Sequence, residues 1–120
     1  MSPASHFLLV DPAGLDMYGL KYSDKHLVFK WVGGDIYFSM TQVGGAAECH
    51  FAAAKKDLRS VKHIIELFVG FVFWLFPWCK MVITLLPSSK KSIERVIKKL
   101  GFVQFCEYEG GIGYMRRKDG

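Results

Sequence analysis

The chain has 120 residues, of which 51% are hydrophobic and 22% are charged. This length fits one domain over residues 1–120, and this composition excludes disordered, collagen-like and low-complexity chains, which lack the apolar side chains that a core needs. Sixteen Lys and Arg residues against eleven Asp and Glu give a formal net charge of +5. The charge favours an anionic partner, such as a nucleic acid, a phosphate compound or an anionic lipid.

The three cysteines, Cys49, Cys79 and Cys106, form no CxxC pair. The sequence therefore predicts neither a disulfide scaffold nor a structural zinc site, and this usage is typical of a reducing compartment. The first ten residues have no Lys or Arg before their apolar stretch, unlike a secretory leader. We expect a cytoplasmic protein.

The segment from Ile64 to Leu86 is apolar apart from Glu66 and Lys80. Its longest uncharged part, residues 67–79, is shorter than the ~18 residues that a membrane span needs, and it contains Pro77. We predict a buried helix followed by a buried strand and no membrane partner, with membrane insertion as the alternative.

Short apolar runs and turn residues alternate over residues 1–24, where we expect an irregular or abbreviated N-terminal part. β-Branched and aromatic residues then predict a strand over residues 27–32, and a Gly-rich turn joins it to a second strand over residues 36–41. Another glycine pair precedes a third strand, Ala46–Ala54. Three successive antiparallel strands result.

The hydrophobic periodicity changes at Lys55. Apolar residues spaced by three and four from Leu58 onward predict an amphipathic helix, which becomes apolar on all sides from Leu67 and ends at Pro77. A helix of this kind is usually buried on both sides. We therefore expect its second half to lie between the sheet and another element.

A continuous apolar run, Met81–Leu86, predicts a central strand reached by a right-handed crossover. A second amphipathic helix follows, with Ser88 or Ser89 as its N-cap and Gly101 as its stop signal. A final hairpin over residues 102–116 completes the order β-β-β-α-β-α-β-β.

This order, together with the helix Ser92–Phe102 that closes in Lys-Leu-Gly-Phe, resembles the GNAT superfamily of acyl-CoA-dependent N-acyltransferases. The resemblance covers Lys25 to Lys118. It implies an α/β fold with a mixed, mostly antiparallel sheet flanked by helices. The short length and abbreviated N-terminal part look most like the small GNAT-like proteins of bacteriophages, some of which serve in the virion.

The resemblance also implies how acetyl-CoA would be held. In the family, the strand that matches Ala46–Ala54 separates from its neighbour, and its free backbone groups pair with the pantetheine arm of the cofactor. This places Cys49, Phe51 and Ala52 along the cofactor. Lys90 stands where family members often have an Asn that touches it.

The family holds the pyrophosphate through an R/Q-x-x-G-x-G/A pattern at a helix N-terminus, where glycines permit close approach. The matching positions are Arg59, Lys62 and Ile64, so both glycines are replaced. Either side-chain charge replaces them, or the site is lost and the cations form a solvated helix face. The residues that would hold the phosphates are Lys55, Lys56, Arg59, Ser60, Lys62 and His63.

Transfer of an acyl group to an amine requires a base that removes a proton from the ammonium group. Alternation along the third strand places Glu48 and His50 on one face and Cys49 on the other. A carboxylate beside an imidazole is a candidate base. The alternative is a solvated Glu48 and a hydrogen-bonded, partly buried His50.

The family often has a Tyr that protonates the leaving thiolate, and this chain has Ile97 at that position, which we expect in the core. Tyr108 or Tyr114 on the final hairpin is a candidate replacement, with aromatic packing as the alternative role. We take Tyr108 as the catalytic candidate.

The four histidines, His6, His26, His50 and His63, show no ligand spacing among themselves or with the cysteines. The sequence therefore predicts no metal site. It also carries no RNP-like or zinc-finger signature, so we predict no nucleic-acid partner.

Two functions remain open at this point. One is an N-acyltransferase that moves acetyl from acetyl-CoA to a primary amine of a protein or small molecule. The other is a catalytically degenerate phage protein that acts in virion or head assembly, or as a binding module, with phage or host proteins as partners. The apolar side chains of Phe71, Phe73 and Trp74 are candidates for a homodimer contact, because large apolar patches seldom remain exposed.

Overall fold

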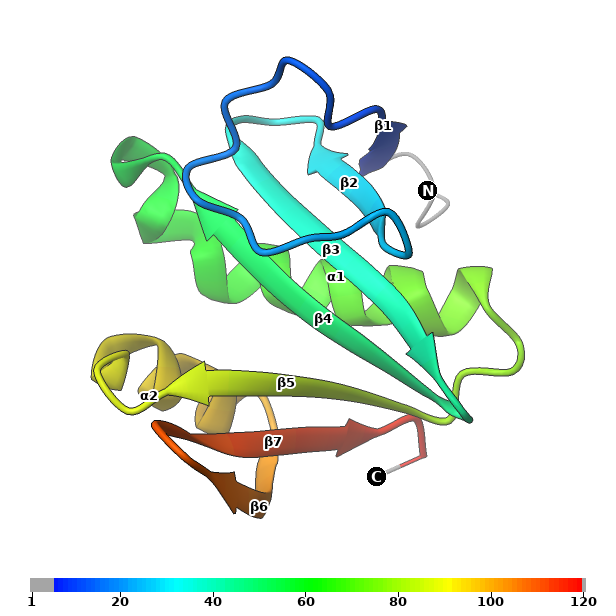
Figure 1. Ribbon diagram of the computed structural model, residues 1–120, viewed down its shortest axis with the longest axis vertical. Helices are drawn as coiled ribbons and strands as arrows, with labels where there is room; N and C mark the ends of the chain where they lie inside the picture. The colour runs from blue at the N-terminus through cyan, green and yellow to red at the C-terminus, as the bar shows by residue number, and fades with distance from the viewer. Residues whose placement is uncertain (1–5, 120) are drawn as a thin grey trace.

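The computed structural model describes residues 6–119, which fold into a seven-stranded sheet with two α-helices (Figure 1). The strand order in the sheet is β1-β2-β3-β4-β5-β7-β6, with β4 and β5 parallel and the remaining described neighbours antiparallel. The predicted mixed, mostly antiparallel sheet is thereby confirmed. The elements are β1 (Phe7–Val10), β2 (Leu27–Trp31), β3 (Ile36–Val43), β4 (Ala46–Ala53), the 3-10 helix η2 (Lys55–Ser60), α1 (Val61–Leu75), β5 (Met81–Pro87), α2 (Lys91–Lys99), β6 (Val103–Tyr108) and β7 (Gly111–Arg117).

The N-terminal part is more regular than we expected, because Phe7–Val10 pairs with β2 as an edge strand. Residues 11–26 then run across one face of the sheet, in front of β3 and β4 in the view of Figure 1. Met17 and Leu20 of this segment pack on Val28 and Tyr37. The segment therefore covers the sheet face that α1 does not.

Helix α1 packs on the opposite face through an aromatic cluster. The Phe68 ring stacks on Phe38 with 4.0 Å between centroids and 10° between planes. Phe7, Phe29 and Phe71 contact this pair edge-on or tilted. Such aromatic contacts add to the stabilisation from apolar burial. They fix α1 across β1, β2 and β3.

The two ends of α1 depart from the prediction. The segment that starts at Lys55 forms the 3-10 helix η2 first, and α1 begins at Val61. Near the other end, Trp74 and Leu75 are 51% and 39% exposed, so the expectation that the second half lies between two layers is wrong for the last turn. Only the side facing the sheet is covered there. Among residues 6–119, no helix has both the length and the apolar character that crossing a bilayer requires.

The N-cap prediction for α2 is also wrong, since the helix begins at Lys91 and Lys90 occupies the cap position. Strand β5 continues through Pro87, and the backbone N–H of Ser88 donates to the carbonyl of Gly110 at 2.9 Å. Ser88 is therefore held in the turn that follows β5. Ile97 is buried in the core, as predicted.

Candidate functional site

The sheet opens between its two central strands. Strands β4 and β5 pair only at Ala46–Met81, Ala47–Val82 and Glu48–Ile83 within the described residues. Beyond Glu48, β4 stays paired with β3 and β5 stays paired with β7. The two strands therefore diverge, as Figure 1 shows, and beyond Glu48 the facing backbone groups of β4 and β5 do not pair with each other.

A cavity of about 460 Å³ occupies this opening. Its lining includes Thr84 and Leu85 of β5, Ile93 of α2, and Tyr18 and Lys21 of the N-terminal segment. Five residues singled out from the sequence also line it: His50, Phe51, Ala52, Lys90 and Tyr108. The fold thus brings predicted residues from β4, β6 and the start of α2 to one cavity.

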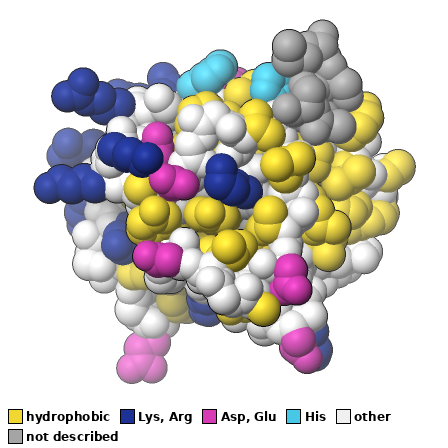
Figure 2. All heavy atoms as spheres, turned by 90° about the horizontal axis from the view of Figure 1, so that it is seen from above, with side chains coloured by type: hydrophobic (Ala, Val, Ile, Leu, Met, Phe, Trp, Pro, Cys, Tyr) yellow, Lys and Arg dark blue, Asp and Glu magenta, His cyan; other side chains and the backbone are white. Residues whose placement is uncertain are grey.

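The predicted phosphate-binding segment lies next to this cavity rather than in its wall. Leu58 of η2 contributes to the lining, while Lys55, Arg59 and Lys62 are exposed. Figure 2, which keeps the left-right direction of Figure 1, shows Lys and Arg side chains gathered on the side where η2 lies and hydrophobic side chains on the other. An anionic group at the η2 end of the cavity would meet these cations. Ser60 and His63 are also exposed there.

Two residues of this segment point elsewhere. Lys56 Nζ lies 3.0 Å from Asp35 Oδ2, and this contact raises the pKa of the Lys56 ammonium group. Ile64, at one of the lost glycine positions, is 1% exposed in the core. Neither Ile64 nor Lys62 is among the described residues that line the cavity, so the bulk they add does not fill it.

Glu48 and His50 lie at the point where β4 leaves β5. His50 Nε2 and Glu48 Oε1 are 2.9 Å apart, and the two side chains are 11% and 23% exposed respectively. The strand alternation that predicted this pair therefore places it on the face covered by residues 11–26. Such a partly buried carboxylate–imidazole pair is suited to accept a proton.

Cys49 points to the other face of β4. Its side chain is buried in the core, and burial raises the pKa of its thiol far above the ordinary value. A thiol in this state is not a nucleophile. Cys49, which the sequence placed along the cofactor, is not among the described residues that line the cavity.

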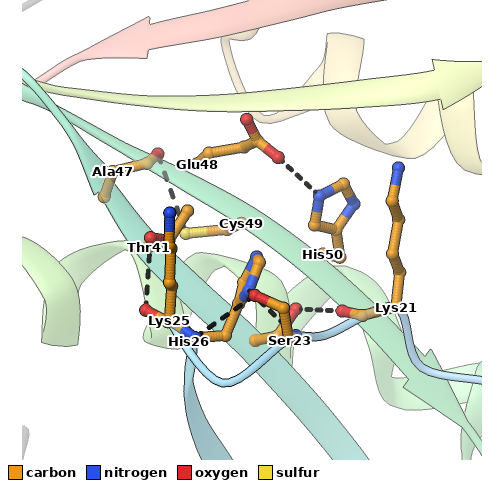
Figure 3. Close-up of polar contacts among 10 residues, drawn as sticks. Lys21, Ser23, Lys25, His26, Thr41, Ala47, Glu48, Cys49 and His50 are labelled. Carbon is orange, nitrogen blue, oxygen red and sulfur yellow. Dashed lines mark hydrogen bonds and ion pairs between the residues drawn. The ribbon is translucent and has the colours of Figure 1, made fainter.

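His26, for which the sequence predicted no role, joins the pair from the segment before β2. One ligand atom each from His26, Glu48 and His50 lies within 4.8 Å of the others. Figure 3 shows the three side chains approaching each other, with Ser23 beside the His26 ring. Burial, followed by the charges of His50 and Lys21, lowers the pKa of His26. The prediction of no metal site rested on the spacing of ligand residues along the chain. That spacing does not reveal a cluster that only the fold brings together.

The path of the N-terminal segment creates this proximity. Ser39 Oγ of β3 donates to the carbonyl of Lys21 at 2.6 Å, and Thr41 Oγ1 donates to that of Lys25 at 3.3 Å. Ser23 then accepts the His26 backbone N–H at 3.1 Å. These contacts hold His26 over β4, and no motif or periodicity in the sequence signals them.

The tyrosines of the final hairpin have different surroundings. Tyr108 lines the cavity and retains 39% exposure. Tyr114 is fully buried, and its hydroxyl donates to Glu94 Oε2 at 2.8 Å. Of the two, Tyr108 is therefore placed to exchange a proton with a ligand in the cavity.

A scan against protein-family models gives no match, and neither does a search of curated proteins. Solved structures do match. The N-acetyltransferase PseH of Campylobacter jejuni, in complex with acetyl coenzyme A, superposes with a TM-score of 0.66 at 10% identity, over 80% of this chain and 70% of that one. The fold is GNAT-like.

Two further structures agree with this assignment. The GNAT domain of S. lividans PAT matches with a TM-score of 0.65 at 10% identity, over 81% of this chain and 64% of the other. Aminoglycoside acetyltransferase AAC(6')-Ib in complex with coenzyme A matches with a TM-score of 0.64 at 14% identity, over 80% and 68%. At these identities the GNAT-like similarity concerns the fold alone. The relation to phage proteins stays a prediction.

Proposed function

We propose that this protein is a GNAT-fold N-acetyltransferase that transfers acetyl from acetyl-CoA to a primary amine of a protein or small molecule. The observation that carries the proposal is the opening between β4 and β5, whose strands pair at three positions and then diverge. Where the strands diverge, their unpaired backbone groups can form hydrogen bonds with an extended ligand, in the way that a sheet edge pairs with an added strand. The pantetheine arm of coenzyme A is an extended chain of amides with this character.

The charge distribution around the opening supports the same ligand. Lys90 lines the cavity, and the exposed cations of η2 and early α1 lie at its η2 end. Their charged side chains bind the phosphates in place of the backbone N–H groups that the family's glycines expose. Arg59 carries the guanidinium group best suited to paired contacts with phosphate oxygens.

The Glu48–His50 pair supplies the base. An amine enters as an ammonium ion, and His50, held by Glu48 at 2.9 Å, accepts its proton. The amine nitrogen then bonds to the acetyl carbon, and the bond between that carbon and sulfur breaks. Tyr108 gives its phenolic proton to the departing thiolate. The second proton, which the nitrogen loses as the amide forms, restores the phenol through solvent, and His50 releases its proton to solvent.

Acetyl transfer from acetyl-CoA to spermidine and to a lysine peptide tests the proposal, with the double variant Glu48→Gln, His50→Ala. General base catalysis typically contributes about 10²- to 10⁴-fold, so we expect kcat/KM to fall at least ~100-fold while coenzyme A binding by calorimetry is retained. Glu66→Gln with His6→Ala, which changes the same residue types away from the cavity, is the matched control. Failure of the unaltered protein to bind acetyl-CoA at millimolar concentration would overturn the proposal.

The second candidate function is a binding module that keeps the fold without the chemistry. The observation that favours it is Ile97, a core residue at the position of the family's proton donor. Coenzyme A binding with no transfer to any amine, and with the Glu48 and His50 variants indistinguishable from the parent, would favour this candidate. A role in virion assembly would then be tested by identifying protein partners.

A further inference from the structure

We propose that the amine acceptor of this protein carries an anionic group, a carboxylate or a phosphate, and that Lys21 binds this group beside the base. The inference rests on the proposed acetyl transfer and names the class of its second substrate. Lys21 belongs to the N-terminal segment, residues 11–26, which covers the sheet face that carries Glu48 and His50. The products are then coenzyme A and an N-acetyl amide that keeps the anionic group.

The backbone of Lys21 is held level with His50. Its carbonyl accepts a hydrogen bond from Ser39 Oγ at 2.6 Å, and Ser39 of β3 is the residue that pairs with His50 of β4. The preceding residue, Leu20, is buried against the same face of the sheet. In Figure 3 the Lys21 side chain extends beside the His50 ring, and both residues line the cavity. The cation therefore lies near the base, and not at the η2 end where the phosphates of coenzyme A are proposed to bind.

The charged side chains that line the cavity are all basic. They are Lys21, Lys90 and, when it is protonated, His50, and no Asp or Glu is among the described lining residues. The Glu48 carboxylate beside His50 is already engaged, since its Oε1 lies 2.9 Å from His50 Nε2. Lys21 forms no ion pair with another residue of the range 6–119. Its exposed ammonium group is therefore free to bind an anion.

This distribution of charge discriminates between classes of amine. A polyamine carries further ammonium groups, which would meet Lys21 and Lys90 where they need carboxylates, and like charges brought together disfavour binding. A small amine with an anionic group on a short chain places its nitrogen at His50 and the anionic group at Lys21, where a charge-assisted hydrogen bond forms. The formal net charge of +5 attracts the same class of substrate.

Acetyl transfer by the full chain to matched pairs of amines tests the inference. One pair is β-alanine and β-alaninamide, and the other is O-phosphoethanolamine and ethanolamine, so that the anionic members distinguish a carboxylate from a phosphate. An exposed charge pair changes binding by up to about 5-fold. We therefore expect the KM of the preferred anionic amine to lie about 5-fold below that of its neutral partner, and spermidine to have the highest KM.

Variants of Lys21 assign the preference to this residue. We expect Lys21→Gln to raise the KM of the anionic amine about 5-fold with kcat little changed, because a contact that is equally strong in the ground state and the transition state affects KM alone. Its affinity for coenzyme A, measured by calorimetry, should equal that of the parent. Lys25→Gln, which changes an exposed lysine of the same segment outside the cavity lining, is the matched control and should keep the preference.

Equal KM values within both pairs, or the lowest KM for spermidine, would overturn the anionic acceptor while acetyl transfer itself stands. A loss of coenzyme A affinity in Lys21→Gln as large as the rise in amine KM would place Lys21 at the cofactor phosphates and also overturn the inference. An absence of transfer to every one of these amines would instead overturn the transferase proposal, and the acceptor class with it.

Discussion

Tyr114 illustrates how a single buried residue links the second helix to the end of the sheet. Tyr114 lies on β7, the strand between β5 and β6, its side chain is fully buried, and its hydroxyl donates to Glu94 of α2 at 2.8 Å. This hydrogen bond, together with the charge of Lys98, holds the pKa of Glu94 below its ordinary value of 4.5. The contact therefore stabilises the folded state only while Glu94 is ionised.

The stability that the protein loses when Tyr114 is replaced with Phe should depend on pH. A carboxyl group whose pKa is lowered by folding contributes stability above its unfolded pKa and loses it as pH falls through the folded pKa. We expect Tyr114→Phe to lower the Tm at pH 7, and the difference from the parent to narrow below pH 4.5. Thermal melts from pH 7 to pH 3 measure it. In a Glu94→Gln background, the stability lost by Tyr114→Phe should no longer depend on pH. A loss independent of pH in the protein that keeps Glu94 would contradict the argument.

The catalytic candidates show what residue-level patterns can predict. Glu48 and His50 were identifiable because strand alternation fixes which residues share a face. His26 was not, because its position depends on two hydroxyl contacts, from Ser39 and Thr41, that hold an irregular segment across β3. No periodicity in the sequence records such contacts.

At the scale of elements, the chain order was predictable and the boundaries less so. The changes in the spacing of apolar residues that mark strands and helices are strong signals. A helix cap is a weaker one: Ser88 has the residue type of an N-cap, but its backbone N–H donates to the carbonyl of Gly110 and so holds it in the preceding turn. The divergence of β4 from β5 could be inferred only by resemblance. Strand pairing is made by backbone groups, which are the same at every residue. The amino-acid composition of a strand therefore does not indicate where it separates from its neighbour.

The exposed cations of η2 and early α1 give a prediction at this scale. We expect Arg59→Ala to weaken coenzyme A binding by up to about 5-fold, because an exposed charge pair contributes about 1 kcal/mol or less. Lys56→Ala is the matched control, since its ammonium group already lies 3.0 Å from Asp35 Oδ2. Its effect should be smaller. Calorimetry at low and at high salt measures both, and the Arg59 effect should shrink as salt screens it.

Equal losses for Arg59→Ala and Lys56→Ala would contradict this assignment of charge to the phosphates. They would indicate that binding responds to net charge alone. A larger loss for Lys56→Ala would point to the Lys56–Asp35 pair as a support for η2 rather than a bystander.

For the whole molecule, the opening divides the sheet into two parts. Strands β1 to β4 carry α1 and the N-terminal segment, while β5, β7 and β6 carry α2 (Figure 1). The sheet joins the parts through three residue pairs between β4 and β5, and the core between α1 and α2 completes the connection. A ligand in the opening would contact both parts at once.

Such a ligand should stabilise the entire fold. A compound that binds only the folded state at 100 times its Kd raises the free energy of unfolding by about 2.7 kcal/mol, which for a domain of this size raises the Tm by roughly 10 °C. We expect this increase from coenzyme A. Adenosine 3′,5′-bisphosphate, which lacks the pantetheine arm, should give much less at equal concentration, because it reaches the cations without pairing with β4. Equal shifts from the two compounds would mean that the opening is not where the pantetheine arm binds.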